Sequence, residues 1–411
     1  MSDIVEEFAD IYLFNPTCEY AVANGNASWQ PNRLLQKMEA DLEVLPLFLA
    51  RSKDYVLVEK RPSENYLALL KNCGIEVPHF MERKTLHVAF SSDLKYSKLK
   101  PWGWSPAAHK LLQPLKVHCS EAFQNSPVFY WQQEYRNYYS KKFSRDILLK
   151  LLAEFPDEDY IHTDKTGQVC SSKSDFEKAL LKWGKIMVKA PWSSSGRGLQ
   201  AVTKTPVHEK VWEKLLGIIK EQGFALVEPH LDKQLDIAFQ FEVEKGNISY
   251  LGISNFITDK KGQYQGNHLN GLPDELDEDL REFVKKVSKK IIAALHKVLS
   301  VSELAKNYEG NFGVDTLIFK DSAGSLKINP CLEINVRQNM GLLSLQLEKL
   351  LLPDSKGIFR TWYQPGSNFM DFSREMQDAH PLQLQNGKIK AGYLPLTEPA
   401  TEKLFGAYML L

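Results

Sequence analysis

The chain has 411 residues with 51 Lys plus Arg and 51 Asp plus Glu, so its formal net charge is zero. This balance excludes a strongly cationic nucleic-acid-binding protein. Hydrophobic residues make up 43% and charged residues 25%, which excludes disordered, collagen-like and disulfide-scaffold chains. At about 150 residues per domain, the length predicts two or three domains.

The sequence carries no targeting or membrane signal that we recognise. It has no run of 18 apolar residues, and its start, MSDIVEEFADIYLF, is acidic where a signal peptide would be basic. The cysteines are scattered without a CxxC pair, which favours neither a disulfide framework nor a zinc knuckle. They are Cys18, Cys73, Cys119, Cys170 and Cys331. We expect a cytoplasmic protein with neither a nucleic-acid nor a membrane partner.

Residues 1–125 alternate strand-like and helix-like segments. IYLFNP (11–16) predicts a strand that ends in a loop, residues 33–42 predict a helix, and DYVLVEK (54–60) predicts a second strand. SENYLALLKNCGIEVPHF (63–80) offers a serine cap, a helix, a glycine stop and another strand. This alternation is typical of a parallel, Rossmann-like sheet.

The middle of the chain predicts helices at 141–156 and 172–184, a strand at 185–191, a glycine-rich loop and a strand near 199–204. A helix at 209–222 and the strand FALVEPHL (224–231) lead into an antiparallel meander. Apolar residues recur every three or four positions in 276–299, which predicts a long helix with a solvated basic face. Two strands, FGVDTLIF (312–319) and LKINPCLEIN (326–335), are separated by the turn sequence DSAG, and two more strands are expected after residue 385.

The segment VKAPWSSSGRGL (188–199) has the composition of a phosphate-binding loop. Lys189 ends a strand, and small residues beyond it let backbone N–H groups approach phosphate oxygens. The loop residues are Ser193, Ser194, Ser195, Gly196, Arg197 and Gly198. The spacing matches neither GxxxxGK[ST] nor GxGxxG. The alternative is a plain β-hairpin with a glycine turn.

The last two strands of this region carry clustered acids. Asp315 lies among apolar residues, while Glu333 and Asn335 alternate with Leu332, Ile334 and Val336 and so share one face. If the strands pair across the turn, Asp315 lies opposite Glu333 or Asn335, and such oxygen ligands suit Mg²⁺. Arg337 continues this face and is suited to neutralise charge on a reacting carboxylate or phosphate. The alternative is a solvent-facing polar strand face.

Together, the lysine with its glycine-rich loop and the Asp and Glu-x-Asn-x-Arg strands resemble the ATP-grasp superfamily over residues 130–350. The resemblance is to bacterial ligase-like members that have a Rossmann-like domain before the ATP-grasp domain. It implies four segments: an N-terminal domain at 1–125, a small lobe at 126–225, a large lobe at 226–355 and a C-terminal tail at 356–411 that packs on the core. The implied fold is a nucleotide site between two α+β lobes.

The resemblance also implies roles for individual residues. Lys189 would reach the α- and β-phosphates, residues 193–198 would cover the β- and γ-phosphates, and Asp315, Glu333 and Asn335 would hold two Mg²⁺ ions. LVEPHL (226–231) would read adenine, with Glu228 near its amino group, Leu231 beside it and Asp236 on the ribose side. An earlier lysine normally contacts the nucleotide; Lys141 or Lys142 is suitable, and Lys142 is preferred. Arg337 and Lys189 are the expected catalytic residues.

Three positions depart from the superfamily pattern. Lys189-Ala190-Pro191 replaces the usual Lys-Pro, and Pro229 removes one backbone donor from the adenine segment. Ala238, rather than Arg, follows Asp236 by two residues, which argues against one amino-acid-ligating branch.

Two polar loops are weaker substrate-binding candidates. GQYQGNHLNG (262–271) offers Tyr264, Asn267 and His268, although a plain surface loop explains it equally well. NPTCEYAVANGN (15–26) offers Asn15 and Glu19 at the carboxyl end of a strand, where open α/β sheets bind ligands. Helix capping and turns explain these two residues equally well.

The activity implied by the resemblance is an ATP- and Mg²⁺-dependent ligase that joins a small-molecule carboxylate to an amine, or another nucleophile, through an acylphosphate. A kinase on the same scaffold and a nucleotide-binding protein without turnover are the alternatives. Homodimers are common in the superfamily, so a homodimer is one option for this chain.

Overall fold

The computed structural model describes residues 8–86, 95–193, 196–259 and 262–411. The chain forms two compact units. Unit 1 comprises the chain up to Trp131, Gly266–Gly271 and Arg337–Leu411, and unit 2 comprises Gln132–Gln265 and Leu272–Val336. The units therefore interleave along the sequence, whereas the expected segments at 1–125, 126–225, 226–355 and 356–411 follow one another.

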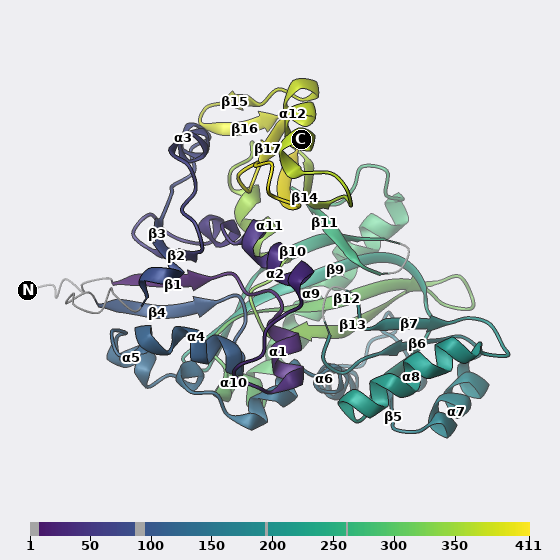
Figure 1. Cartoon of the computed structure of the whole chain (residues 1–411). Helices are drawn as coiled ribbons and strands as arrows, with labels where there is room; N and C mark the ends of the chain where they lie inside the picture. The colour runs from purple at the N-terminus through teal and green to yellow at the C-terminus, as the bar shows by residue number, and fades with distance from the viewer. Residues whose placement is uncertain (1–7, 87–94, 194–195, 260–261) are drawn as a thin grey trace, which may run out of the picture. The chain divides into compact units, whose positions relative to one another are not determined.

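Unit 1 contains a parallel sheet in the order β3-β2-β1-β4 (Figure 1). Its strands are β1 (Ala9–Leu13), β2 (Tyr55–Val58), β3 (His79–Glu82) and β4 (Tyr96–Pro101). Val56, Leu57 and Val58 are fully buried, as is usual for a parallel strand that is covered on both faces. The predicted Rossmann-like arrangement is confirmed.

The helices around this sheet begin at short polar caps. They are α1 (Cys18–Asn24), α2 (Arg33–Leu42), α3 (Glu64–Asn72), α4 (Pro106–Lys116) and α5 (Glu121–Gln124). Asn32, Ser63 and Ser105 accept backbone N–H groups at the starts of α2, α3 and α4. The apolar run LEVLPLF forms a short 3₁₀ helix, Leu45–Phe48, because Pro46 removes a strand donor and favours a helical start.

Unit 1 also contains an antiparallel group of strands in the order β11-β14-β18-β17. They are β11 (Tyr264–Leu269), β14 (Gly357–Tyr363), β18 (Phe405–Leu410) and β17 (Tyr393–Pro395). Helices α11 (Met340–Glu348) and α12 (Phe369–Ala379) and the hairpin β15 (Gln383–Gln385) and β16 (Lys388–Ala391) complete this part.

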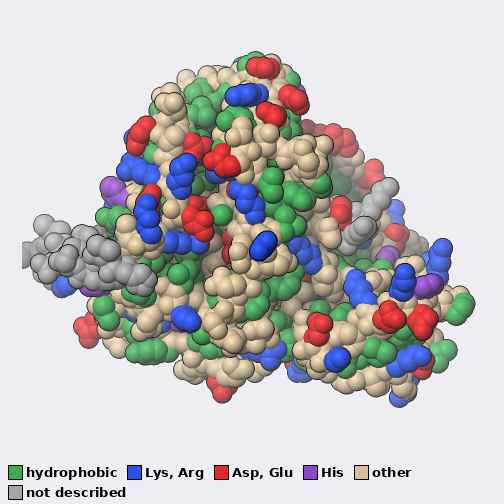
Figure 2. Space-filling view, in the orientation of Figure 1, with side chains coloured by type: hydrophobic (Ala, Val, Ile, Leu, Met, Phe, Trp, Pro, Cys, Tyr) green, Lys and Arg blue, Asp and Glu red, His purple; other side chains and the backbone are tan. Residues whose placement is uncertain are grey.

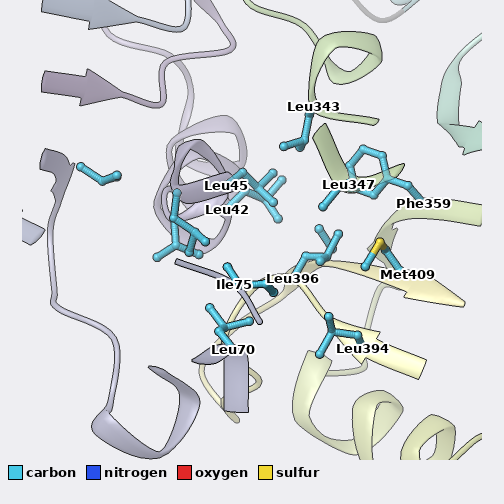
Figure 3. Packing of buried hydrophobic residues seen from close by; sticks show 14 of the residues in the cluster. Leu42, Leu45, Leu70, Ile75, Leu343, Leu347, Phe359, Leu394, Leu396 and Met409 are labelled. Atoms are coloured by element: carbon cyan, nitrogen blue, oxygen red, sulfur yellow. The ribbon is translucent and has the colours of Figure 1, made fainter. Parts of the chain in front are cut away.

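The hydrophobic core of unit 1 joins side chains from both ends of the sequence (Figure 3). Leu42, Leu45 and Leu70 from the first part of the chain belong to the same buried cluster as Leu347 and Met409. The last residues, expected as a tail that packs on the core, are themselves part of this core, because β14, β17 and β18 supply apolar side chains to it.

Unit 2 contains a small antiparallel sheet in the order β5-β8-β6-β7. Its strands are β5 (Gln168–Cys170), β8 (Ala225–Pro229), β6 (Ile186–Lys189) and β7 (Leu199–Val202), and its helices are α7 (Lys173–Trp183) and α8 (Glu209–Gln222). Phe176, Val188, Leu215 and Val227 lie in one buried cluster that joins the helices to the sheet.

Unit 2 also contributes four neighbouring strands to a larger antiparallel sheet, in the order β13-β12-β9-β10. Its long strands are β9 (Asp232–Glu244), β10 (Asn247–Thr258), β12 (Gly310–Lys320) and β13 (Leu326–Asn335). Helices α6 (Lys141–Glu154), α9 (Glu278–Ser300) and α10 (Glu303–Asn307) accompany it. The predicted basic face of α9 is exposed, and two of its lysines, Lys286 and Lys290, pair with Asp159 and Asp157 at 2.7 Å each.

The surface is consistent with the neutral charge balance. Acidic and basic side chains are interspersed across the face shown in Figure 2. Among the described residues, no helix is both long enough and apolar enough to cross a membrane.

Candidate functional site

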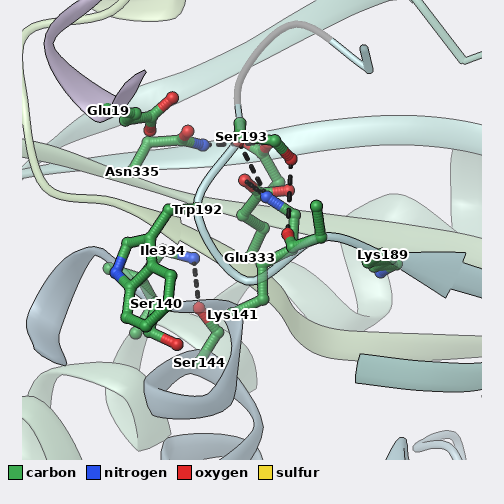
Figure 4. Close-up of polar contacts among 12 residues, drawn as sticks. Glu19, Ser140, Lys141, Ser144, Lys189, Trp192, Ser193, Glu333, Ile334 and Asn335 are labelled. Carbon is green, nitrogen blue, oxygen red and sulfur yellow. Dashed lines mark hydrogen bonds and ion pairs between the residues drawn. The ribbon is translucent and has the colours of Figure 1, made fainter. Parts of the chain in front are cut away.

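Lys141 occupies a buried position at the start of α6. The hydroxyl of Ser140 caps this helix by accepting the Lys142 N–H at 3.2 Å, and the Lys141 N–H donates to the Pro191 carbonyl at 3.0 Å. The Lys141 side chain is only 4% exposed. Its ammonium donates to the Ser193 carbonyl at 2.9 Å and pairs with Glu333 Oε1 at 2.7 Å (Figure 4).

Lys142, the lysine preferred from the sequence, lies elsewhere. Its side chain is 51% exposed and pairs with Asp146 at 2.7 Å, one helical turn further along α6. Neighbouring residues on a helix point about 100° apart, so only one of the two lysines can face the sheet. The structure brings Lys141, not Lys142, to the acidic residues.

The acidic residues lie on paired strands, as the sequence predicted. Asp315 on β12 is directly opposite Glu333 on β13, and Asn335 Nδ2 donates to Asp315 Oδ2 at 3.0 Å. Like charges directly opposite each other on a sheet are destabilising, so a nearby cation stabilises this pair. Lys141 supplies one positive charge at Glu333.

The donor set fits a hard divalent cation. Asp315 and Glu333 offer carboxylate oxygens, and the Asn335 amide keeps its oxygen as an acceptor while its nitrogen faces Asp315. Oxygen ligands of this kind suit Mg²⁺, which binds one or two carboxylates together with phosphates. In the described part of the chain, no group of three or more His, Cys, Asp or Glu side chains could hold a metal ion.

Ser144 hydrogen-bonds the strand that carries Glu333 and Asn335, and it was not among the residues expected from the sequence. The Ser144 hydroxyl accepts the N–H of Ile334, the residue between Glu333 and Asn335, at 2.8 Å. Ser144 is 1% exposed and lies three residues after Lys141, so both residues face β13. The sequence signal that could have identified Ser144 is a serine three residues after a lysine, on the otherwise apolar face of a predicted helix.

Lys189 and Glu228 form a second buried ion pair. Their charged atoms are 2.6 Å apart, and the side chains are 6% and 12% exposed. Lys189 is on β6 and Glu228 on the adjacent strand β8, where Lys189 lies opposite Leu226. The structure therefore joins two residues to which the resemblance gives separate roles, at the phosphates and at adenine.

The glycine-rich loop is closely packed at its base. A Cβ on Gly198 would lie 2.1 Å from Ser193 Oγ, so only glycine fits there. The Gly198 carbonyl accepts the Ala190 N–H at 2.9 Å, and the Ser193 hydroxyl donates to the Ala190 carbonyl at 3.3 Å. Gly196 has φ +73°, Arg197 is exposed, and Ser194 and Ser195 lie outside the described residues.

Asp236 also lies within a charged network of unit 2. It is 8% exposed, pairs with Lys233 at 2.6 Å and accepts the Thr258 hydroxyl at 3.0 Å. Leu231 is partly buried, and its carbonyl accepts the Lys233 N–H at 3.0 Å. Pro229 ends β8 opposite Ile186 on β6.

Arg337 and Glu19 form an ion pair within unit 1. Arg337 Nε donates to Glu19 Oε1 at 3.1 Å, and Glu19 is only 5% exposed. The segment at 15–26 was expected to be a loop. Residues Cys18–Asn24 instead form helix α1, and Glu19 lies in its first turn. Burial raises the pKa of the Cys18 thiol, which is consistent with an inert side chain.

Asn15 has a structural role beside this pair. Its side-chain amide donates to the Gly103 carbonyl at 2.8 Å and accepts the Gly103 N–H at 3.3 Å. A Cβ on Gly103 would lie 2.2 Å from Cys18 Sγ and 3.2 Å from the Arg337 Cβ. Asn15 thus holds the glycine that lets the backbone pass next to Arg337.

The segment at 262–271, expected as a polar loop, is largely a strand. Asn267 and His268 lie on β11 opposite Phe359 and Ile358 of β14, and Tyr264 begins the strand. A Cβ on Gly266 would lie 2.1 Å from the Phe359 carbonyl, so glycine permits this pairing. Asn267 is fully buried, whereas the surface-loop interpretation required exposure.

No family model matches the chain, and no curated protein sequence matches it. Solved structures do match over nearly the whole chain. The biotin carboxylase of Campylobacter jejuni, in a β-γ-ATP complex, is 14% identical with a TM-score of 0.52, over 98% of this chain and 87% of that chain. The chain has the ATP-grasp fold.

Two further matches have the same ATP-grasp fold. The biotin carboxylase domain of Hydrogenobacter thermophilus 2-oxoglutarate carboxylase, a dimer with MgADP, ADP and bicarbonate, is 10% identical with a TM-score of 0.50, over 98% of this chain and 86% of that chain. Rhizobium etli pyruvate carboxylase is 11% identical with a TM-score of 0.53, over 98% of this chain and 35% of that chain. At these identities the similarity concerns the fold.

The two sheets of unit 2 account for the α+β lobes of the ATP-grasp fold. The small sheet carries Lys189 and Glu228, and the large sheet carries Asp236, Asp315, Glu333 and Asn335. The described residues of unit 2 therefore include two buried lysines, each paired with a carboxylate.

Proposed function

We propose that the protein is an ATP- and Mg²⁺-dependent ligase that joins a carboxylate to an amine, or another nucleophile, through an acylphosphate. The observation that carries this proposal is a cluster of four residues in unit 2. Asp315 lies opposite Glu333, Asn335 donates a hydrogen bond to Asp315, and the buried Lys141 forms an ion pair with Glu333. The structural neighbours support it, since biotin carboxylases with this fold were solved with β-γ-ATP and with MgADP and bicarbonate.

In this proposal Asp315, Glu333 and Asn335 hold the magnesium, and Lys141 and Lys189 contact the phosphates. Magnesium would supply charge neutralisation on the phosphate oxygens. Arg337, whose guanidinium Glu19 orients within unit 1, would stabilise negative charge on the reacting carboxylate. The chain's part is positioning and electrostatics, and no side-chain nucleophile is needed. The free, buried cysteines are consistent with this chemistry and with a cytoplasmic location.

The first test is a thermal-shift titration with ADP and with a non-hydrolysable ATP analogue, each with Mg²⁺. At about 100 times its dissociation constant, a ligand stabilises the folded state by about 2.7 kcal/mol, which gives a clear shift in melting temperature. We expect this shift in the wild type and its loss in Lys189→Ala. The exposed Lys178, changed to Ala, is the matched control and should keep the shift.

Because Lys189→Ala leaves Glu228 unpaired, that variant should melt earlier even without ligand. The comparison must therefore be made on the ligand-induced shift, and the Lys189→Ala/Glu228→Gln pair removes both charges together. Absence of a shift in the wild type would refute the nucleotide site.

Identifying the reaction products then distinguishes a ligase from a kinase. We expect inorganic phosphate when carboxylate and amine libraries are supplied with ATP, and no turnover in Glu333→Gln. A stable phosphoester product would instead identify a kinase. The dimer in the Hydrogenobacter structure also supports testing for a homodimer by sedimentation.

A further inference from the structure

The ammonium of Lys141 is shared between the proposed metal site and the glycine-rich loop. It is 2.7 Å from Glu333 Oε1 and donates to the Ser193 carbonyl at 2.9 Å. Figure 4 shows both contacts from one side chain. The side chain is 4% exposed and that of Glu333 23%, so water screens this pair poorly.

A divalent cation on Glu333 would therefore meet a positive charge that is already there. The Glu333 carboxylate can balance the single positive charge of Lys141, but it cannot also balance the two positive charges of the metal ion. Asp315, opposite Glu333, adds one negative charge and offsets only part of the excess. Nucleotide phosphates change this balance, because they carry enough negative charge to neutralise the ammonium and the metal together.

We propose that Lys141 is the internal counter-ion of Glu333 and makes metal binding and nucleotide binding depend on each other. This inference rests on the function proposed above for the same site. Lys141 disfavours a divalent cation on Asp315, Glu333 and Asn335 until phosphates arrive. Reciprocally, Glu333 lowers the attraction of Lys141 for phosphates until a metal ion binds the Glu333 carboxylate in place of Lys141.

Lys189 differs from Lys141 in this respect. Its partner, Glu228, is on the small sheet and is not among the proposed metal ligands. Loss of Lys189 should thus weaken nucleotide binding without changing the affinity for metal alone. Both lysines would thus contribute to phosphate binding, but only Lys141 would couple phosphate binding to metal binding.

The test measures each ligand separately, so that chelation of metal by nucleotide does not interfere. Mn²⁺ binding without nucleotide is followed by electron paramagnetic resonance of free Mn²⁺, and ADP binding in EDTA by calorimetry. In Lys141→Met we expect Mn²⁺ to bind at least about tenfold more tightly than in the wild type and ADP at least about tenfold more weakly. Lys142→Met, which removes the exposed neighbour paired with Asp146, should change neither affinity.

Glu333→Gln supplies the mirror-image result and an independent variant if Lys141→Met does not fold. Mn²⁺ binding should weaken, while metal-free ADP should bind more tightly because the ammonium has lost its carboxylate. Unchanged or weaker Mn²⁺ binding in a folded Lys141→Met, or unchanged or weaker ADP binding in Glu333→Gln, overturns the coupling. If wild-type protein still binds ADP with Mg²⁺, the proposed function survives that outcome; if it does not, the proposed function itself fails.

Discussion

Lys116 is a buried cation, and its ammonium forms no ion pair with a carboxylate in the part of the chain that the structure describes. Its ammonium is 2.9 Å from His109 Nδ1, contacts the Phe129 carbonyl and lies 4.8 Å from the centre of the Phe129 ring. Burial lowers the pKa of Lys116 to about 8. Burial, with the nearby Lys116 charge, lowers the pKa of His109 to about 3, so His109 is neutral and can accept a hydrogen bond.

This environment predicts an unusual pH dependence of stability. The pKa of Lys116 is about 8 in the folded protein and 10.5 ordinarily, so between these values the unfolded chain binds more protons. The free energy of unfolding contributed by Lys116 should therefore rise with pH across that window, by up to about 3 kcal/mol. Urea melts of wild type and Lys116→Met at pH 7.5 and 10 should show the gain only in the wild type. Parallel pH profiles would contradict it.

At the scale of elements, the Ser144 hydroxyl joins α6 to β13, the strand that carries Glu333 and Asn335. Ser144→Ala leaves the buried N–H of Ile334 without its acceptor, which typically costs about 1–3 kcal/mol. We expect a lower free energy of unfolding in denaturant melts and faster hydrogen exchange at Ile334. Ser174→Ala, on the exposed side of α7, is the control and should stay within about 0.5 kcal/mol of wild type. An equal effect of the two changes would show that the contact contributes nothing.

Elements with strong local signals could be predicted from the sequence. The helices at 33–42 and 209–222 have the predicted bounds, since caps and apolar spacing define them locally. The DSAG turn predicted Asp315 opposite Glu333 or Asn335, and the structure has Glu333 there. Asp321 stabilises this turn by accepting N–H groups from Ala323 and Ser325.

Other features depend on tertiary contacts and could not be predicted in this way. Lys141 and Lys142 are equivalent in the sequence, and only the side of α6 that packs on β13 distinguishes them. Asn267 looked like a loop residue because Gly266 and Asn270 surround the strand with turn-forming residues. One pairing partner of β11 is β14, about 90 residues later in the chain.

At the scale of the whole molecule, each unit has its own hydrophobic core, so a core substitution in one unit should destabilise mainly that unit. Leu347→Ala in unit 1 removes a fully buried side chain and should cost about 2–5 kcal/mol. We expect the amides of β14 and β18 to lose hydrogen-exchange protection, while those of β9 and β12 keep theirs. Leu215→Ala, on helix α8 in the small-sheet core of unit 2, is the reciprocal control. Uniform loss of protection in both units would show a single cooperative block.

The interleaved chain path sets an order for folding during synthesis. Every residue of unit 2 has been translated by Val336, whereas the core of unit 1 still lacks Leu394, Leu396 and Met409 at that point. Contacts between residues so distant in sequence form slowly, and the apolar faces that await them stay exposed to aggregation. The strands that carry Asp315 and Glu333 can thus be complete on the ribosome while the parallel sheet, although first in the sequence, still awaits the end of the chain.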